Sequence, residues 1–598
     1  MMYDRGAGGR QGLGVREHID RVPYLAPMTD PDEGSLTGMD TDLSARQPLA
    51  TLSRRRALQL LGVGSGSMLL AACAGTAPQA SPTLAVVAAT PTRAPQAQPT
   101  TVQAQPTVQA ASTSASSAGA PKPGGTLRAL QAGDLASLDG HYYTTGNGLS
   151  VWIIYDTLTA YDDNLKPQPA LAESWEQSPD GTQITLTLRK GVQFHSGREL
   201  TSDDVIYNLN RILDFKLTAG IITGFVPPET TWVARDKYTV TLTATKPWAA
   251  VFDFFQVLNI IDKDTAEGPD AKTRAVGTGP FAFEEWVQGD HVTYRKNKNY
   301  WQSGQPYLDA ITLGFAKDQQ SMVAQFEAGA ADFVVNPPLR DYARLSADPQ
   351  YQGLELPNPA AFWMLQPNST RAPMTDKRVR QALNYAIDRQ RMIDTVLLGL
   401  TKPQALPWPA ASPASEPQKN ASYAFDLDRA KSLLTDANAT DWTLDLLYST
   451  VSLEAAGFAQ IYQADLAKIG VKGEIRTLEP AALLDAWHTQ NYGLYFASDP
   501  WSNLEPVTQF TSGSTTNYRG NNGGFLDDTY TQLVQAAATE PDADKRKRLY
   551  SQLNDFLLDA SFVFPLASRQ TRSLARVNVH DVGHRRNEMY TFHRAWLG

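Results

Sequence analysis

Residues 155–212 read YDTLTAYDDNLKPQPALAESWEQSPDGTQITLTLRKGVQFHSGRELTSDDVIYNLNRI, and this stretch decides the fold class. Within it, ITLTL at 184–188 alternates apolar and polar residues, the period-two pattern of a strand with one buried face. Thr201 and Asp204, three residues apart, then form the capping-box pattern that starts a helix. The apolar positions behind them fall on one helical stripe: Val205, Ile206, Leu209, Ile212 and Leu213. A strand followed closely by a capped helix indicates an α/β protein.

The same alternation of strands and helices continues along the chain. Another strand pattern is YTVTLTAT, which starts at residue 238. TLDLLYST (443–450), a helix through FAQIYQADLAKIG (458–470) and VKGEIRTLE (471–479) form a strand–helix–strand unit, which predicts a parallel pair. Two more amphipathic helices are predicted, at 376–399 and 542–559. We therefore expect an α/β chain with at least two lobes.

Length and charge exclude several classes of function. The 598 residues carry 53 Lys and Arg against 62 Asp and Glu, a net charge of −9. A mildly acidic chain without basic blocks is a poor candidate for nucleic-acid binding, so no such partner is expected. The body from residue 122 is too long for one core and fits two or three domains. It contains no apolar run long enough to span a membrane.

The only cysteine, Cys73, lies in the segment 53–75, SRRRALQLLGVGSGSMLLAACAG. A cationic start, a short apolar run and small residues at the end are the layout of an export signal. The pair Arg54 and Arg55 resembles the twin-arginine export motif, and Leu70–Cys73 resembles a bacterial lipobox, whose cysteine is acylated. We therefore expect residues 1–72 to be a leader and signal that is removed. The alternative is a buried apolar helix with the cysteine in its core.

Residues 73–121 are interpreted as a lipidated cysteine followed by a linker. The linker consists almost entirely of Ala, Pro, Thr, Gln, Ser and Val, which bury too little apolar surface to offset backbone ordering, so we expect disorder. Two or three acyl chains hold a protein stably on a bilayer. The predicted location is therefore extracytoplasmic, with Cys73 anchored in the cell membrane.

Four blocks of the body carry a resemblance to a known family. One is the stretch 155–212, and three others accompany it: GGTLRALQAGDLASLDG (124–140), VGTGPFAFEEWVQGDHVTYRKNKNYW (276–301) and PMTDKRVRQALNYAIDRQRMI (373–393). Their order resembles that of the family 5 extracellular solute-binding proteins, the peptide and nickel binders of ABC importers. The resemblance spans nearly the whole body.

The resemblance implies a periplasmic-binding-protein-like fold of type II, in the large three-subdomain variant. This is an α/β fold with two lobes, a hinge and a ligand cleft between the lobes. By analogy, the segments are 122–157, 276–365 and 570–598 for the first lobe, 158–275 for a subdomain inserted in it, and 366–569 for the second lobe. The implied protein is a monomer that captures a peptide or similar small organic solute and delivers it to an ABC permease. It is not an enzyme and needs no cofactor.

The resemblance also places a ligand cleft. Such a cleft needs aromatic walls and a few placed polar groups. Residues that fit this requirement at the family's cleft positions are Tyr142, Tyr143, Thr145, Phe362, Trp363, Trp408, Asp499, Trp501 and Asn503. For each aromatic residue, core packing is the alternative interpretation.

The segment FASDPWSNLEP (496–506) departs from the family pattern. Peptide binders of the family carry a pattern like W-x-A-D-Y-x-D-P here, and its first aspartate pairs with the free ammonium group of the peptide. Asp499 can correspond to the later Asp-Pro, which leaves Ser498 or a neighbour at the ammonium position. An oligosaccharide or other neutral solute stacked on indole therefore remains an alternative to a peptide.

Other functions stay open at this point. The same fold can present its ligand to a sensory receptor instead of a permease. An exported hydrolase is a remote alternative, because the chain has no G-x-S-x-G, H-E-x-x-H or P-loop motif. A nickel site is not favoured, because the eight histidines are scattered. His195, Asp203 and Asp204 are interpreted as scaffold, and Arg378 and Arg380 as solvated or locally paired.

Overall fold

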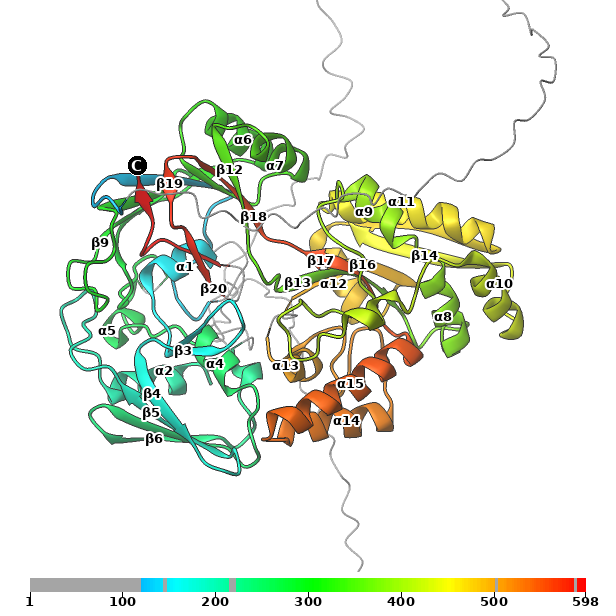
Figure 1. The fold of residues 1–598 in the computed structure, drawn as a ribbon, viewed down its shortest axis with the longest axis horizontal. Coiled ribbons are helices and arrows are strands. Elements are labelled where there is room, and N and C mark those ends of the chain that lie inside the picture. Colours follow the sequence, from blue (N-terminus) through cyan, green and yellow to red (C-terminus); the bar gives the residue numbers. More distant parts are fainter. Residues whose placement is uncertain (1–119, 143–147, 214–221, 271, 501–503, 586–588) are drawn as a thin grey trace, which may run out of the picture. The chain divides into compact units, whose positions relative to one another are not determined.

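The computed structural model describes residues 120–142, 148–213, 222–270, 272–500, 504–585 and 589–598 (Figure 1). Helices and strands alternate along these residues, and the strands form two large sheets and several small ones. The α/β class predicted from the sequence is therefore confirmed.

The first lobe is built on a seven-stranded sheet in the order β12-β18-β11-β1-β10-β9-β8. Its strands are β1 (Thr126–Ala132), β8 (Phe281–Val287), β9 (His291–Lys296), β10 (Ala310–Ala316), β11 (Phe333–Val335), β12 (Tyr351–Glu355) and β18 (Arg572–Arg576). β1 runs parallel to both of its neighbours, and the remaining pairs are antiparallel. β18 comes from the C-terminal region and lies between β12 and β11.

Short elements complete the first lobe. Its helices are α1 (Gly148–Ile154), α6 (Gln319–Glu327) and α7 (Leu339–Ser346). The chain end adds four short strands, β19 (Val579–His580), β20 (Gly583–Arg585), β21 (Met589–Thr591) and β22 (Trp596–Leu597). β20 pairs with β21 and β19 with β22.

The inserted subdomain holds a four-stranded antiparallel sheet in the order β4-β5-β7-β6. Its strands and helices are β2 (Thr159–Tyr161), β3 (Pro167–Pro169), β4 (Ala172–Gln177), β5 (Gln183–Leu188), β6 (Thr231–Asp236), β7 (Thr239–Thr243), α2 (Ser202–Arg211), η1 (Thr223–Phe225), α4 (Val251–Val257) and α5 (Lys263–Ala266). The predicted strand at 184–188 is β5, with Ile184, Leu186 and Leu188 buried in one cluster. The pattern of alternation thus identified the buried face correctly.

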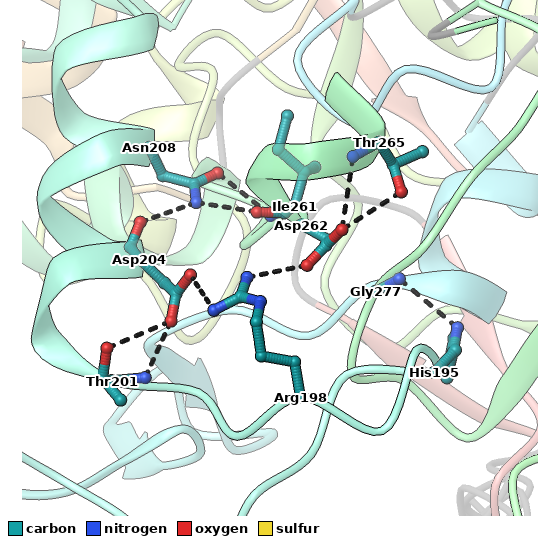
Figure 2. A network of polar contacts seen from close by, with 9 residues as sticks. All are labelled: His195, Arg198, Thr201, Asp204, Asn208, Ile261, Asp262, Thr265 and Gly277. Carbon is teal, nitrogen blue, oxygen red and sulfur yellow. Dashed lines mark hydrogen bonds and ion pairs between the residues drawn. The ribbon is translucent and has the colours of Figure 1, made fainter. Parts of the chain in front are cut away.

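The predicted capping box starts α2. The Thr201 amide donates to Asp204 Oδ2 at 2.9 Å, and the buried Asp204 also pairs with Arg198 at 2.7 Å (Figure 2). Arg198 reaches in the other direction to Asp262, again at 2.7 Å, and so links α2 to the start of α5. Of the predicted apolar stripe, Val205, Leu209 and Ile212 are buried and Ile206 is half-buried. Leu213 is 52% exposed, because it follows the last turn of the helix.

His195 is part of the scaffold, as the sequence suggested. Its Nδ1 accepts from the Gly277 amide at 3.3 Å (Figure 2). The Nε2–H therefore donates to the Gly279 carbonyl at 3.0 Å. The Gly279 amide donates in turn to Ile154 O at 2.9 Å. A Cβ on Gly277 would lie 2.3 Å from the same oxygen, so only glycine fits this close approach.

The second lobe is built on a five-stranded sheet in the order β15-β14-β16-β13-β17. Its strands are β13 (Ala361–Pro367), β14 (Trp442–Ser449), β15 (Val471–Leu478), β16 (Leu494–Asp499) and β17 (Phe564–Arg569). β14 runs parallel to β15 and β16, and α11 (Leu453–Lys468) lies between β14 and β15 in sequence, which confirms the predicted strand–helix–strand unit. β13 is antiparallel to both β16 and β17.

Helices cover both faces of this sheet (Figure 1). One face packs against α8 (Lys377–Tyr385), α9 (Arg389–Val396), α10 (Leu427–Asp436) and α11. The other packs against α13 (Pro506–Ser512), α14 (Asp528–Thr539) and α15 (Ala543–Ala560). Two further helices are η2 (Pro417–Ala421) and α12 (Pro480–His488).

Two expectations for this lobe were wrong. The single helix predicted at 376–399 is two helices, because Asp388 accepts a hydrogen bond from the Arg391 amide and caps a new start. Arg378 does pair locally, with Asp376, but Arg380 is buried. Its guanidinium donates to the carbonyls of Ala560, Met374 and Thr375, which replace water around the charge.

Two segments connect the two sheets. Residues 356–360 lead from β12 to β13, and residues 570–571 lead from β17 to β18. They lie side by side (Figure 1), because Gln570 Nε2 donates to Leu356 O at 3.0 Å and the Leu356 amide donates to Thr571 O at 3.3 Å. We name 356–360 and 570–571 the hinge. β13 begins at Ala361, so the predicted lobe boundary after residue 365 falls inside this strand.

A buried polar cluster joins the first lobe to α2. Arg211 forms an ion pair with Asp139 at 2.6 Å and donates to His141 Nδ1 at 3.0 Å. Since that nitrogen accepts, the Nε2–H of His141 donates to Asn259 O at 2.9 Å, and the ring is neutral. Burial and the Arg211 charge lower the pKa of His141 to about 4.

This cluster predicts a loss of stability in acid. Because the folded-state pKa of His141 lies below 6.5, its contribution is complete above pH 6.5 and is lost as the pH falls toward 4. The difference amounts to about 3 kcal/mol. His141→Gln keeps one donor and one acceptor but has no titrating group. Between pH 7 and pH 4, its free energy of unfolding, measured in urea, should therefore fall by about 3 kcal/mol less than that of the wild type. His488→Gln, at a half-buried site, serves as the control, and parallel curves for His141→Gln and the wild type would contradict the assignment.

Candidate functional site

The carboxyl edge of the second sheet brings three of the predicted ligand residues together. β14, β15 and β16 are parallel, so their carboxyl ends share one edge, and antiparallel β13 begins at that edge. In register, Phe362 lies opposite Asp499 and Trp363 lies opposite Ser498. Open α/β sheets bind ligands at the carboxyl ends of their strands. This edge is therefore the candidate site.

Trp363 and Phe362 point to opposite faces of the sheet. Trp363 is half-buried, packs edge-on against Phe458 of α11 at 5.6 Å between ring centroids, and lies 5.7 Å from the guanidinium carbon of Arg569. Ser498, its cross-strand neighbour, is also half-buried. Trp363 thus presents part of an indole ring, next to a hydroxyl group and a cation, at the edge.

Phe362 and Trp408 lie in the core on the other face. Both belong to one buried cluster with Phe510 of α13, whose ring centroid is 5.6 Å from that of Trp408. The indole Nε1 of Trp408 donates to Asn554 Oδ1 at 2.7 Å, so its polar group is already satisfied. Protein atoms enclose both side chains, as the core-packing alternative expects, and ligand contact by them stays a prediction.

Asp499 is enclosed on the same face as Phe362. Its carboxylate is 1% exposed and accepts hydrogen bonds from the Thr515 hydroxyl and from Gln509 Nε2, the latter at 3.1 Å. Burial is the main cause that raises the pKa of Asp499 to about 6, against an ordinary value of 3.8. Through these bonds, Asp499 holds together Gln509 of the helix and Thr515 of the loop that follows it.

Tyr142 is half-buried beside the polar cluster of the first lobe. Its amide donates to Asp139 O at 3.1 Å, so the Arg211–Asp139 pair fixes the backbone at this position. Several predicted positions lie outside the described residues: Tyr143, Thr145, Trp501, Asn503, Cys73, Arg54 and Arg55.

From the sequence, Ser498 was named only for the ammonium position and Arg569 was not named, so neither residue was predicted to lie beside Trp363. Strand alternation could have predicted the position of Ser498, since adjacent residues such as Ser498 and Asp499 face opposite sides of the sheet. Asp499 shares the enclosed face with Phe362, so Ser498 must lie on the face of Trp363. The approach of Arg569 to Trp363 depends on β17 pairing with β13, which no local pattern gives.

Within the described ranges, no group of three His, Cys, Asp or Glu side chains is arranged to hold a metal ion. Nor does any described helix combine the length and apolar character that a membrane crossing requires.

Two curated proteins match much of the chain. Heme-binding protein A of Haemophilus influenzae is 29% identical over 427 residues, which are 64% of this chain and 76% of that protein. Di/tripeptide-binding protein 1 of Pseudomonas aeruginosa is 28% identical over 500 residues, 75% of this chain and 90% of that protein.

A solved structure agrees with the fold. The binding protein AgaA in complex with agropinic acid, from A. tumefaciens R10, is 26% identical, with a TM-score of 0.66 over 79% of this chain and 99% of that one. The sequence model of a protein family, described as bacterial extracellular solute-binding proteins, family 5 Middle, matches residues 166–521, more than half of the chain. The chain belongs to the bacterial extracellular solute-binding proteins of family 5.

Proposed function

We propose that this protein captures a peptide or similar small organic solute between its two lobes and delivers it to the permease of an ABC importer. Family membership supports solute binding, and the hinge is the observation that carries the mechanism. Two short segments, hydrogen-bonded to each other at Leu356, connect the sheets. Few backbone angles need to change for the lobes to open and close around such a connection.

Closure is driven by contacts that the solute makes with both lobes. A ligand shifts an equilibrium only by its differential affinity, and about 5.5 kcal/mol moves it from 1:99 to 99:1. In our proposal Trp363 forms one wall at the second lobe and the Tyr142–Thr145 segment contributes from the first. Trp501 and Asn503 complete the site. The side chains that pack beneath the binding surface, and so hold it in position, are Phe362, Trp408 and Asp499.

The proposed class of solute depends on which polar groups of the site already form hydrogen bonds within the protein. The Asp499 carboxylate is enclosed and bonded to Thr515 and Gln509, so in our proposal the free ammonium of a peptide does not pair with it. A peptide would then be held through its backbone and side chains. The half-buried ring of Trp363 favours an oligosaccharide or another neutral solute as the second candidate.

Location is also part of the proposal. We place the protein outside the cytoplasm, with lipidated Cys73 in the cell membrane and the linker as a tether. The order of twin arginines, apolar run and lipobox-like Leu70–Cys73 supports this location.

The function is tested by identifying the bound solute. Full-length protein extracted from membranes is unfolded, and mass spectrometry identifies what it releases. Trp363→Ala should then weaken affinity for that solute at least about tenfold, because one aromatic wall is lost. Trp442→Ala, at the opposite edge of the same sheet, is the control and should leave affinity within about twofold. Equal affinities for both variants would remove Trp363 from the site.

The anchor predicts a change in fractionation. Cys73→Ser removes the only sulfur that can be acylated, so the protein should move from the membrane fraction to the soluble extracytoplasmic fraction and lose label from radioactive palmitate. Retention of label in the variant would disprove lipidation at Cys73.

Asp499 predicts a pH dependence opposite to that of His141. Its folded-state pKa of about 6 lies above 3.8, so its contribution to stability is complete below pH 3.8 and is lost as the pH rises through 6. Asp499→Asn cannot ionise and should be spared this loss of about 3 kcal/mol between pH 4 and pH 8 in urea unfolding. Asp436→Asn, at an exposed position, is the control. The same pH profile for Asp499→Asn and the wild type would show that the carboxylate is not desolvated.

A further inference from the structure

The inserted subdomain contacts the second lobe at a junction that shares no residue with the hinge. Asp253 of α4 accepts hydrogen bonds at Oδ2 from the Glu505 amide at 2.9 Å and from the Thr508 hydroxyl at 2.8 Å. Its Oδ1 accepts from the Tyr161 hydroxyl at 3.0 Å, within its own subdomain. Asp253 is completely buried. One carboxylate thus joins β2 and α4 to the start of α13.

The start of α13 is fixed firmly to the second lobe. The carboxylate of Glu505 pairs with Arg546 of α15 at 2.9 Å and also accepts from the Tyr550 hydroxyl. Val507 and Phe510 lie in the core of the second lobe. The bonds to Asp253 therefore connect two separately packed bodies.

Apolar contacts surround these hydrogen bonds. Leu504 belongs to the second lobe in sequence, but it is completely buried in the core cluster of the inserted subdomain, which includes Val251 and Phe254. Ala249 and Ala250 pack in the reverse direction, against the core of the second lobe. At the far end of α13, the Ser512 hydroxyl donates to Gly224 O at 3.1 Å. Both ends of α13 thus contact the subdomain.

We propose that Asp253 is a latch that holds the lobes closed and sets how often they separate. The proposal rests on the proposed function only in that the lobes open about the hinge. Opening must withdraw Leu504 from the subdomain core and break both bonds at Oδ2, because these groups lie on opposite sides of the junction. A bond to a charged group is among the stronger polar contacts in a protein, so the latch contributes a large share of the closing free energy.

The latch is tested by the accessibility of Leu504, without any solute. In full-length protein carrying Cys73→Ser and Leu504→Cys, a maleimide reacts only when position 504 leaves the subdomain core. Asp253→Asn keeps the shape but removes the charge, and it should raise the labelling rate about tenfold. Thr508→Val, which removes one of the two bonds, should raise it by less.

Two controls separate opening from loss of fold. Asp262→Asn alters a buried carboxylate of the same subdomain that bonds Arg198 and Thr265, and it should leave labelling within about twofold. Val534→Cys, in place of Leu504→Cys, reports the core of the second lobe, and Asp253→Asn should not change its rate.

Two results would overturn the latch. One is an unchanged rate at position 504 in both latch variants. The other is an equal increase at position 534, which would mean that Asp253 supports folding and not closure. Neither result depends on which solute the protein carries, so failure of the latch and failure of the proposed function are distinguishable.

Discussion

The hydrogen bonds between residues 356 and 570–571 impose the constraint on which the rest of the structure depends. Each connection continues a strand of one sheet into a strand of the other, β12 into β13 and β17 into β18. Because the two connections bond to each other, they act as one narrow ribbon. Away from these connections, the described contacts between the inserted subdomain and the second lobe involve side chains, such as those of Asp253, Leu504 and Ser512. In our proposal the lobes open and close by bending at this ribbon, where a few residues absorb the change in backbone angles.

The contacts away from the ribbon divide into two kinds. Trp363 and Ser498 are half-buried at the edge of a sheet, where a solute can add contacts. Asp253, Leu504 and Thr508 are buried; Asp253 accepts a hydrogen bond from the Thr508 hydroxyl, and Leu504 packs in the apolar core of the subdomain. In our proposal, the first kind makes closure depend on the solute, and the second supplies closing free energy without it. When the buried contacts bring the open and closed states close to equal free energy, only a small differential affinity of the solute for the closed state is needed to close the lobes.

Local rules predicted much of this fold. Thr201 and Asp204 marked a helix start, and the strand–helix–strand unit at 443–479 was identified from periodicity, because each signal depends on residues close in sequence. The break at Asp388 was missed, since the apolar stripe continues across it. Phe362 and Trp363 are adjacent and equally aromatic, so composition could not tell which one faces the core. That distinction needed the register of β13 with β16. Trp408 was assigned to the cleft because nothing local indicates its partner Asn554, almost 150 residues away.

The position of β18 determines the order in which the lobes can be completed. All strands of the second sheet lie in one continuous segment, residues 361–569. The first sheet needs residues 572–576 between β11 and β12. A ribosome adds about 5 to 20 residues per second, so the N-terminal half waits, with two strand edges unpaired, until the chain is almost finished. The lobe whose synthesis begins first is therefore completed only after the second sheet has all of its strands.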